Sequence, residues 1–155
     1  MSTTHTIGIA QMIVVKAPEQ IRSVLGSCVG VTLVDRRAKI GGMVHVILPD
    51  SSEGSGDPGK FADTAVELLL ESMLNAGATR GRICAKIAGG AQMFGAASQN
   101  GLGERNISAV KKRLNKYMIP INAEDCGGQK GRKITLDPTN GDLQVKIIGK
   151  EPRTI

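Results

Sequence analysis

The chain has almost no aromatic side chains from which to build a core. Its 155 residues include two Phe, one Tyr and no Trp, whereas glycine occupies 20 positions. The interior must therefore be filled by Ile, Val, Leu, Met and Ala. The many glycines predict tight turns, or points where the backbone comes close to another group. The scarcity of aromatic rings also argues against a nucleic-acid partner, because single strands bind by stacking their bases on such rings.

Length and composition predict one soluble domain spanning residues 1–155, with residues 1–6 as a flexible tail. No apolar run reaches the roughly 18 residues that span a bilayer, so we expect no direct membrane insertion. The first ten residues lack the basic and apolar regions of a secretory signal. Three cysteines in no CxxC pair indicate a reduced, cytoplasmic protein, and their spacing predicts no metal site. We expect no organic cofactor.

Hydrophobic periodicity predicts an α/β layered fold in which two main helices pack on a mixed, hairpin-rich sheet. A Gly-Ser-Cys corner leads into a strand with alternating valines, and a polar turn at 36–39 joins that strand to the next. The pattern predicts strands over 7–15, 29–33, 40–48, 83–88, 121–125, 133–137 and 142–148. It predicts helices over 61–76 and 104–118.

The formal net charge of +6 fits a nucleic acid, a membrane surface or an acidic protein as partner. The basic residues do not cluster strongly, so charge alone decides none of these.

Cys28 and His45 are the candidate pair for nucleophilic chemistry. Gly26 and Ser27 form a corner whose backbone N–H groups can stabilise an oxyanion. A free thiol has a pKa of about 8.5 and needs a base, and His45 lies on the strand expected to pair beside Cys28. The alternative is a buried, inert cysteine with a structural histidine, which composition and spacing alone favour. The other two cysteines, Cys84 and Cys126, have no histidine to serve them except one in the expected tail.

Six motifs, in order between Ile7 and Ile148, resemble the CheD family, the chemoreceptor glutamine deamidases of bacterial and archaeal chemotaxis. They are LGSCVGVTLVD, GGMVHVILPDS, PGKFADTAVELLL, KIAGGAQMF, GERN and AEDCGGQKGRKI. The resemblance implies a hydrolase that converts glutamines of methyl-accepting chemoreceptors to glutamate and ammonia. It also implies a fold like that of the cytotoxic necrotizing factor catalytic domain and a papain-like mechanism.

The resemblance carries the nucleophile onto Cys28 and the histidine onto His45. The family's third catalytic residue is a threonine a few residues before the cysteine, and this sequence has none there. Ser23 is the chemically nearest substitute, but the spacing can instead select Arg22, which accepts no hydrogen bond. We expect the glycine-rich loops 89–103 and 127–131 to border a shallow site.

The resemblance further implies two partners, the chemoreceptor as substrate and a CheC-type phosphatase as regulator. Nothing in the sequence demands an oligomer, so we expect a monomer. Because the threonine is missing, one alternative is a non-catalytic or weakly catalytic regulator that binds the phosphatase. Another is a thiol sensor, or a different amide hydrolase on the same scaffold.

Overall fold

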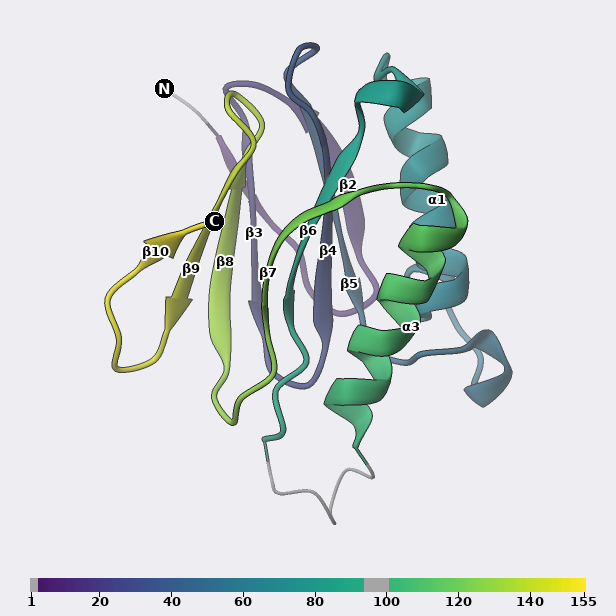
Figure 1. Cartoon of the computed structure of the whole chain (residues 1–155), viewed down its shortest axis with the longest axis vertical. Helices are drawn as coiled ribbons and strands as arrows, with labels where there is room; N and C mark the ends of the chain where they lie inside the picture. Colours follow the sequence, from purple (N-terminus) through teal and green to yellow (C-terminus); the bar gives the residue numbers. More distant parts are fainter. Residues whose placement is uncertain (1–2, 94–100) are drawn as a thin grey trace.

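In the described residues, two five-stranded sheets and two α-helices form three layers (Figure 1). The computed structural model describes residues 3–93 and 101–155. One layer, here called the flanking sheet, has the order β1-β3-β8-β9-β10; its strands are β1 (Thr4–Thr6), β3 (Gln20–Leu25), β8 (Arg132–Asp137), β9 (Asp142–Ile147) and β10 (Arg153–Thr154). The middle layer, the central sheet, has the order β2-β5-β4-β6-β7; its strands are β2 (Met12–Lys16), β5 (Ile40–Val46), β4 (Val29–Asp35), β6 (Cys84–Gly89) and β7 (Ile121–Cys126).

Both sheets are mixed, as predicted for a layered α/β domain. The β1–β3 and β6–β7 pairs are parallel, and the other neighbours are antiparallel. The predicted hairpins β4–β5 and β8–β9 are both present. The strands divide between two sheets where the sequence patterns suggested one. The reason is that β3 and β4 follow each other along the chain but join different sheets.

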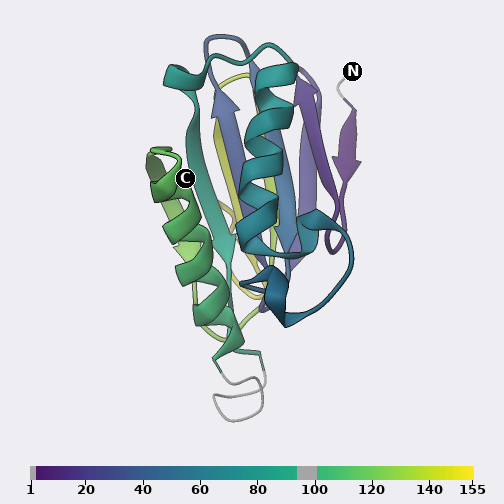
Figure 2. The same ribbon diagram turned by 90° about the vertical axis from the view of Figure 1, so that its right-hand side faces the viewer.

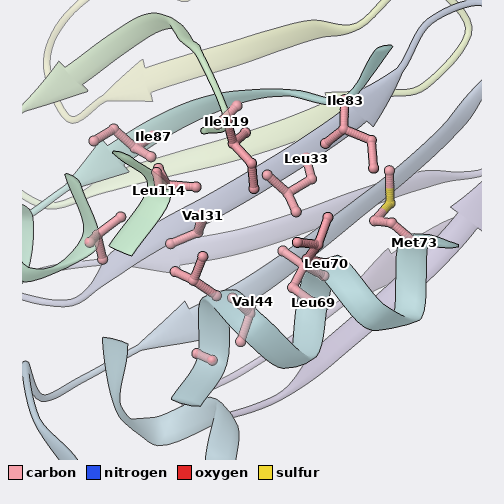
Figure 3. Packing of buried hydrophobic residues seen from close by; sticks show 14 of the residues in the cluster. Val31, Leu33, Val44, Leu69, Leu70, Met73, Ile83, Ile87, Leu114 and Ile119 are labelled. Carbon is pink, nitrogen blue, oxygen red and sulfur yellow. The ribbon is translucent and has the colours of Figure 1, made fainter. Parts of the chain in front are cut away.

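The helices α1 (Ala62–Asn75) and α3 (Leu102–Lys116) cover the outer face of the central sheet (Figure 2). Helix α1 buries residues at helical spacing, and Gly77 follows its end with a φ of +109°. Figure 3 shows the packing of this layer, in which Leu69, Leu70 and Met73 meet Leu33 and Val44 of the sheet. Within the described residues, no helix is both long and apolar enough to cross a bilayer.

A second core fills the space between the two sheets. It contains Ile21 and Leu25 from β3, Met43 from β5 and Ile134 and Leu136 from β8. The buried hydrophobic residues are almost all aliphatic, and Phe61, at 3% exposed, is the one buried aromatic residue in the described part of the chain. The polar side chains of Ser23 and His45 are also buried in this part of the molecule.

The N-terminal region differs from the expectation. Thr4–Thr6, which lie within the expected tail, form β1 and pair in parallel with β3. The strand predicted over 7–15 begins only at Met12, because residues 7–11 turn the chain from one sheet to the other. The Gln11 side chain accepts a hydrogen bond from the Gly8 N–H in this turn. The sequence patterns do not predict β3 or β10, and part of the expected loop 89–103 lies outside the described residues.

Candidate active site

Residues 26–28 form a corner that carries the chain from the flanking sheet to the central sheet. Strand β3 ends at Leu25 and β4 begins at Val29. The Cys28 side chain lies in the core between the sheets and is 8% exposed. The predicted Gly-Ser-Cys corner is therefore present, and it holds the thiol at the junction of the two sheets.

Strand register brings His45 to the same face as Cys28. Gly30 of β4 is the direct partner of His45 of β5. Cys28 precedes Gly30 by two residues, so the thiol and the imidazole project to one side of the central sheet as diagonal neighbours. That side faces the flanking sheet. In the described part of the chain, no hydrogen bond joins the two side chains.

Ser23 holds the imidazole from the flanking sheet. Its Oγ lies 2.9 Å from His45 Nδ1 and 2.8 Å from the carbonyl oxygen of Ile7, to which it donates. A hydroxyl has a single proton, and a carbonyl can only accept. Nδ1 must therefore carry a hydrogen and donate it to Ser23, which leaves the lone pair on Nε2. Of the two candidates left open by the sequence, the structure brings Ser23 and not Arg22 to His45.

Burial favours the uncharged forms of both side chains. It lowers the pKa of His45 and raises the pKa of Cys28 from their ordinary values. The backbone N–H of Cys28 opposes the second effect, because it hydrogen-bonds the thiol of its own residue. At neutral pH the site thus holds a neutral imidazole able to accept a proton and a thiol able to give one.

All three carbonyl groups of the corner accept hydrogen bonds from neighbouring segments. The Gly26 oxygen accepts from the Ala91 N–H at 2.9 Å, and the Cys28 oxygen accepts from the Gly90 N–H at 2.8 Å. The Ser27 oxygen accepts from the Asn106 side chain at 3.1 Å. No described backbone carbonyl accepts from the N–H groups of Ser27 or Cys28. A trans peptide points its N–H opposite to its carbonyl, so the anchoring at Ser27 directs the Cys28 N–H away from the Asn106 side chain.

Asn106 of α3 is a site residue that the sequence analysis missed. Its side chain is fully buried, and Nδ2 donates both to Ser27 and, at 2.9 Å, to the carbonyl oxygen of Ile47. It therefore ties the cysteine corner to the end of the histidine strand. Its Oδ1 is buried without a partner in the described structure. The available signal was its place in GERN, one helical turn before the buried Val110, where a polar side chain faces inward.

Glycines allow the surrounding backbone to approach the corner closely. A Cβ atom at Gly89, where φ is +108°, would lie 2.2 Å from the Cys28 carbonyl oxygen. The Gly127 N–H donates to the Gly89 oxygen, and the Gln92 N–H donates to the Gly128 oxygen. The two glycine-rich segments, in their described parts, therefore lie beside the corner.

The other cysteines lie away from His45. Cys84 is in β6, and Cys126 ends β7, where burial above all raises its pKa to about 11. His5, expected in a solvated tail, contacts Glu19 at 2.6 Å instead. Across residues 3–93 and 101–155, no three His, Cys, Asp or Glu side chains gather as metal ligands would.

A family model described as "CheD chemotactic sensory transduction" matches residues 47–147. The chain belongs to the CheD family. It is 46% identical over 155 aligned positions, covering 96% of both chains, to "Probable chemoreceptor glutamine deamidase CheD" of Lachnoclostridium phytofermentans. It is 45% identical to the protein of the same name from Geobacillus kaustophilus, with both chains fully covered. It is 44% identical, again over both full lengths, to "Chemoreceptor glutamine deamidase CheD" of Halalkalibacterium halodurans.

These comparisons confirm the CheD resemblance drawn from the sequence motifs. The family-model match begins two residues after His45. The assignment of individual site residues within this CheD-family chain therefore rests on the geometry described above.

Proposed function

We propose that this chain hydrolyses the side-chain amides of chemoreceptor glutamines to glutamate and ammonia. The observation that carries the proposal is the chain of contacts from the Ile7 carbonyl through Ser23 to His45. It leaves the lone pair of an uncharged imidazole on Nε2, and His45 lies on the face of the sheet that also bears Cys28. The names of the relatives supply the substrate class.

In the first half of the reaction, His45 Nε2 takes the thiol proton as Cys28 Sγ attacks the amide carbon. The carbonyl oxygen becomes an oxyanion in the tetrahedral intermediate. The C–N bond then breaks, and ammonia leaves with the proton that Nε2 returns to it. The product of this half is a thioester between Cys28 and the former glutamine side chain.

The backbone N–H groups of Ser27 and Cys28 are the proposed oxyanion donors, at the corner beginning with Gly26. Their orientation is supported by the anchored carbonyl groups of Gly26 and Ser27, which belong to the same two peptide groups. Donors fixed before the reaction stabilise the developing charge without reorganising. In this mechanism Asn106 is a positioning residue, because it acts through the peptide between Ser27 and Cys28.

In the second half, water attacks the thioester while neutral His45 accepts its proton. The second tetrahedral intermediate collapses to a glutamate side chain, and Cys28 leaves as the thiol after regaining a proton from His45. Ser23 accepts from Nδ1–H throughout, so that each proton enters and leaves through Nε2. The hydroxyl of Ser23 supplies the orienting contact that the missing threonine put in question.

We also propose that the chain acts as one domain and as a monomer in the cytoplasm, with a CheC-type phosphatase as regulatory partner. Family resemblance supports the partner. The case for a purely regulatory protein rested on the missing threonine, and the Ser23 contact with His45 weakens that case.

The test is mass spectrometry of a receptor cytoplasmic fragment incubated with the wild-type chain, Cys28→Ala or Cys84→Ala. We expect wild type and Cys84→Ala to release ammonia and to give the mass increase of amide-to-acid conversion at particular glutamines. Cys28→Ala should give neither. Deamidation that persists with Cys28→Ala would overturn the assigned nucleophile. No deamidation by any of the three would overturn the enzyme function.

A further inference from the structure

The outer face of the flanking sheet carries an exposed apolar groove beside the cysteine corner. The groove has a volume of about 400 Å³. Of the six large apolar side chains exposed in the described structure, Val24, Met93 and Ile148 all line it. Scattered exposed apolar residues are ordinary, but a group of them in one hollow indicates a binding surface. Gly26 also lines this groove, two residues before the proposed nucleophile.

Two lysines stand directly opposite each other in the wall of the groove. Lys133 of β8 pairs in register with Lys146 of β9 and, on its other side, with Val24 of β3. Like charges directly opposite in a sheet destabilise it. No acidic side chain forms an ion pair with either lysine in the described structure. Lys146 donates instead to the backbone carbonyl of Lys150. This arrangement favours a partner that brings negative charge together with apolar side chains.

Strand β8, which carries Lys133, has no free edge beneath the groove, because it is paired on one side by β3 and on the other by β9. Strand β3 is paired by β1 only over Gln20–Arg22. A partner that lies over Lys133 and Lys146 therefore cannot pair with β8 as a new strand and must be recognised by its side chains. An amphipathic helix meets that requirement, because its apolar stripe can enter a groove while acidic residues at its border meet lysines.

We propose that this groove docks an acidic, amphipathic helical segment of the substrate receptor and so delivers the target glutamine to Cys28. The inference rests on the proposed deamidase function and names the surface that gives the enzyme its protein substrate. Contacts made far from the reacting atoms, and made equally in the bound and transition states, change KM rather than kcat.

The test compares the double variant Lys133→Glu/Lys146→Glu with Lys16→Glu/Lys112→Glu, which alters net charge equally at exposed positions elsewhere. With a folded receptor cytoplasmic fragment as substrate, we expect the groove variant to raise KM by about tenfold or more with kcat nearly unchanged. The control variant should stay within about threefold of wild type. The wild-type KM should also rise with salt, and that dependence should weaken in the groove variant. Equal KM values for the two double variants would overturn the proposal.

Direct binding separates this proposal from the proposed function. Fluorescence anisotropy of the labelled receptor fragment, with Cys28→Ala as background, measures docking whether or not the wild type is an enzyme. Val24→Glu should weaken this binding. If binding is unaffected by Val24→Glu and by the lysine changes, docking at the groove is wrong even where deamidation occurs. If the groove substitutions instead abolish a concentration-dependent dimer in sedimentation, the occupant is a second copy and the proposal is also overturned.

Discussion

At the residue scale, the hydroxyl proton of Ser23 determines which nitrogen of His45 can act as a base. Ser23 donates to Ile7 and therefore accepts from Nδ1. Ser23→Ala removes that acceptor and allows both tautomers, so we expect kcat to fall on the order of 10²-fold. Ser23→Thr keeps the hydroxyl and should retain most of the activity.

The pH profile of this variant distinguishes positioning from a loss of packing. In the wild type, kcat/KM should fall at acid pH with a midpoint below 6.5, because burial lowers the pKa of His45 and only its neutral form accepts a proton. Ser23→Ala should move that midpoint further toward acid, since the imidazolium loses a hydrogen-bond acceptor. Ammonia release across pH measures it, and wild-type kcat with an unmoved midpoint would contradict the role of Ser23.

Asn106 provides a second test at the residue scale. Asn106→Ala frees the Ser27 carbonyl, so the Cys28 N–H loses its fixed direction and kcat should fall by about 10²-fold with little change in KM. The loss of two hydrogen bonds in a buried position should also lower the free energy of unfolding by about 1–3 kcal/mol. The matched control is Asn115→Ala, an exposed asparagine on the same helix. Measuring kcat and KM at a temperature where both variants are folded gives the comparison. A change in KM alone would contradict the positioning role of Asn106.

At the scale of elements, the parts of the site that form locally were the predictable ones. The β4–β5 hairpin is a short-range structure, so alternation and one polar turn were enough to place Cys28 beside His45. Strand β3 escaped prediction because its inner residues include Ser23 and its main partner, β8, lies far along the chain. The division into two sheets follows from the corner at residues 26–28. Local periodicity reveals neither strand β3 nor this division, because each depends on pairing between distant segments.

The glycine pattern was more informative than any single strand. The glycine-rich loop 89–103 was expected to border the site, and Gly89 meets the Cys28 carbonyl where no Cβ atom fits. The role of Asn106 was hidden for a different reason. A helix with Val110 and Leu114 on one face predicts a buried stripe, but the spacing alone does not reveal which backbone carbonyl a polar member of that stripe will meet.

At the scale of the whole molecule, Asp35 links the β4–β5 turn to the segment that precedes β6. Its fully buried carboxylate accepts from the N–H groups of Ala38 and Thr79 and from Arg82. Burial alone would raise its pKa, but the Arg82 side chain and the two N–H groups outweigh burial and lower the pKa to about 2.

A depressed pKa predicts how acid acts on stability. The folded state favours the charged form of Asp35. The contribution of Asp35 to the free energy of unfolding is therefore present above the unfolded pKa of about 4 and is lost as pH falls toward 2. We expect Asp35→Asn to lower the free energy of unfolding at pH 7 by about 2 kcal/mol, with a smaller difference from wild type near pH 3. Urea unfolding at both pH values measures this, and a difference independent of pH would contradict it.

The pairing of β3 with β8 also has a consequence for how the protein is made. Ile21 is opposite Leu136, so β3, the strand that holds Ser23, pairs with a strand that lies more than a hundred residues later in the chain. The β4–β5 hairpin emerges from the ribosome early and can bring Cys28 beside His45 well before then. The orienting contact from Ser23 depends on the pairing of β3 with β8, which can form only after β8 has been synthesised. During synthesis the nascent chain therefore carries its nucleophile before it carries the arrangement that directs it.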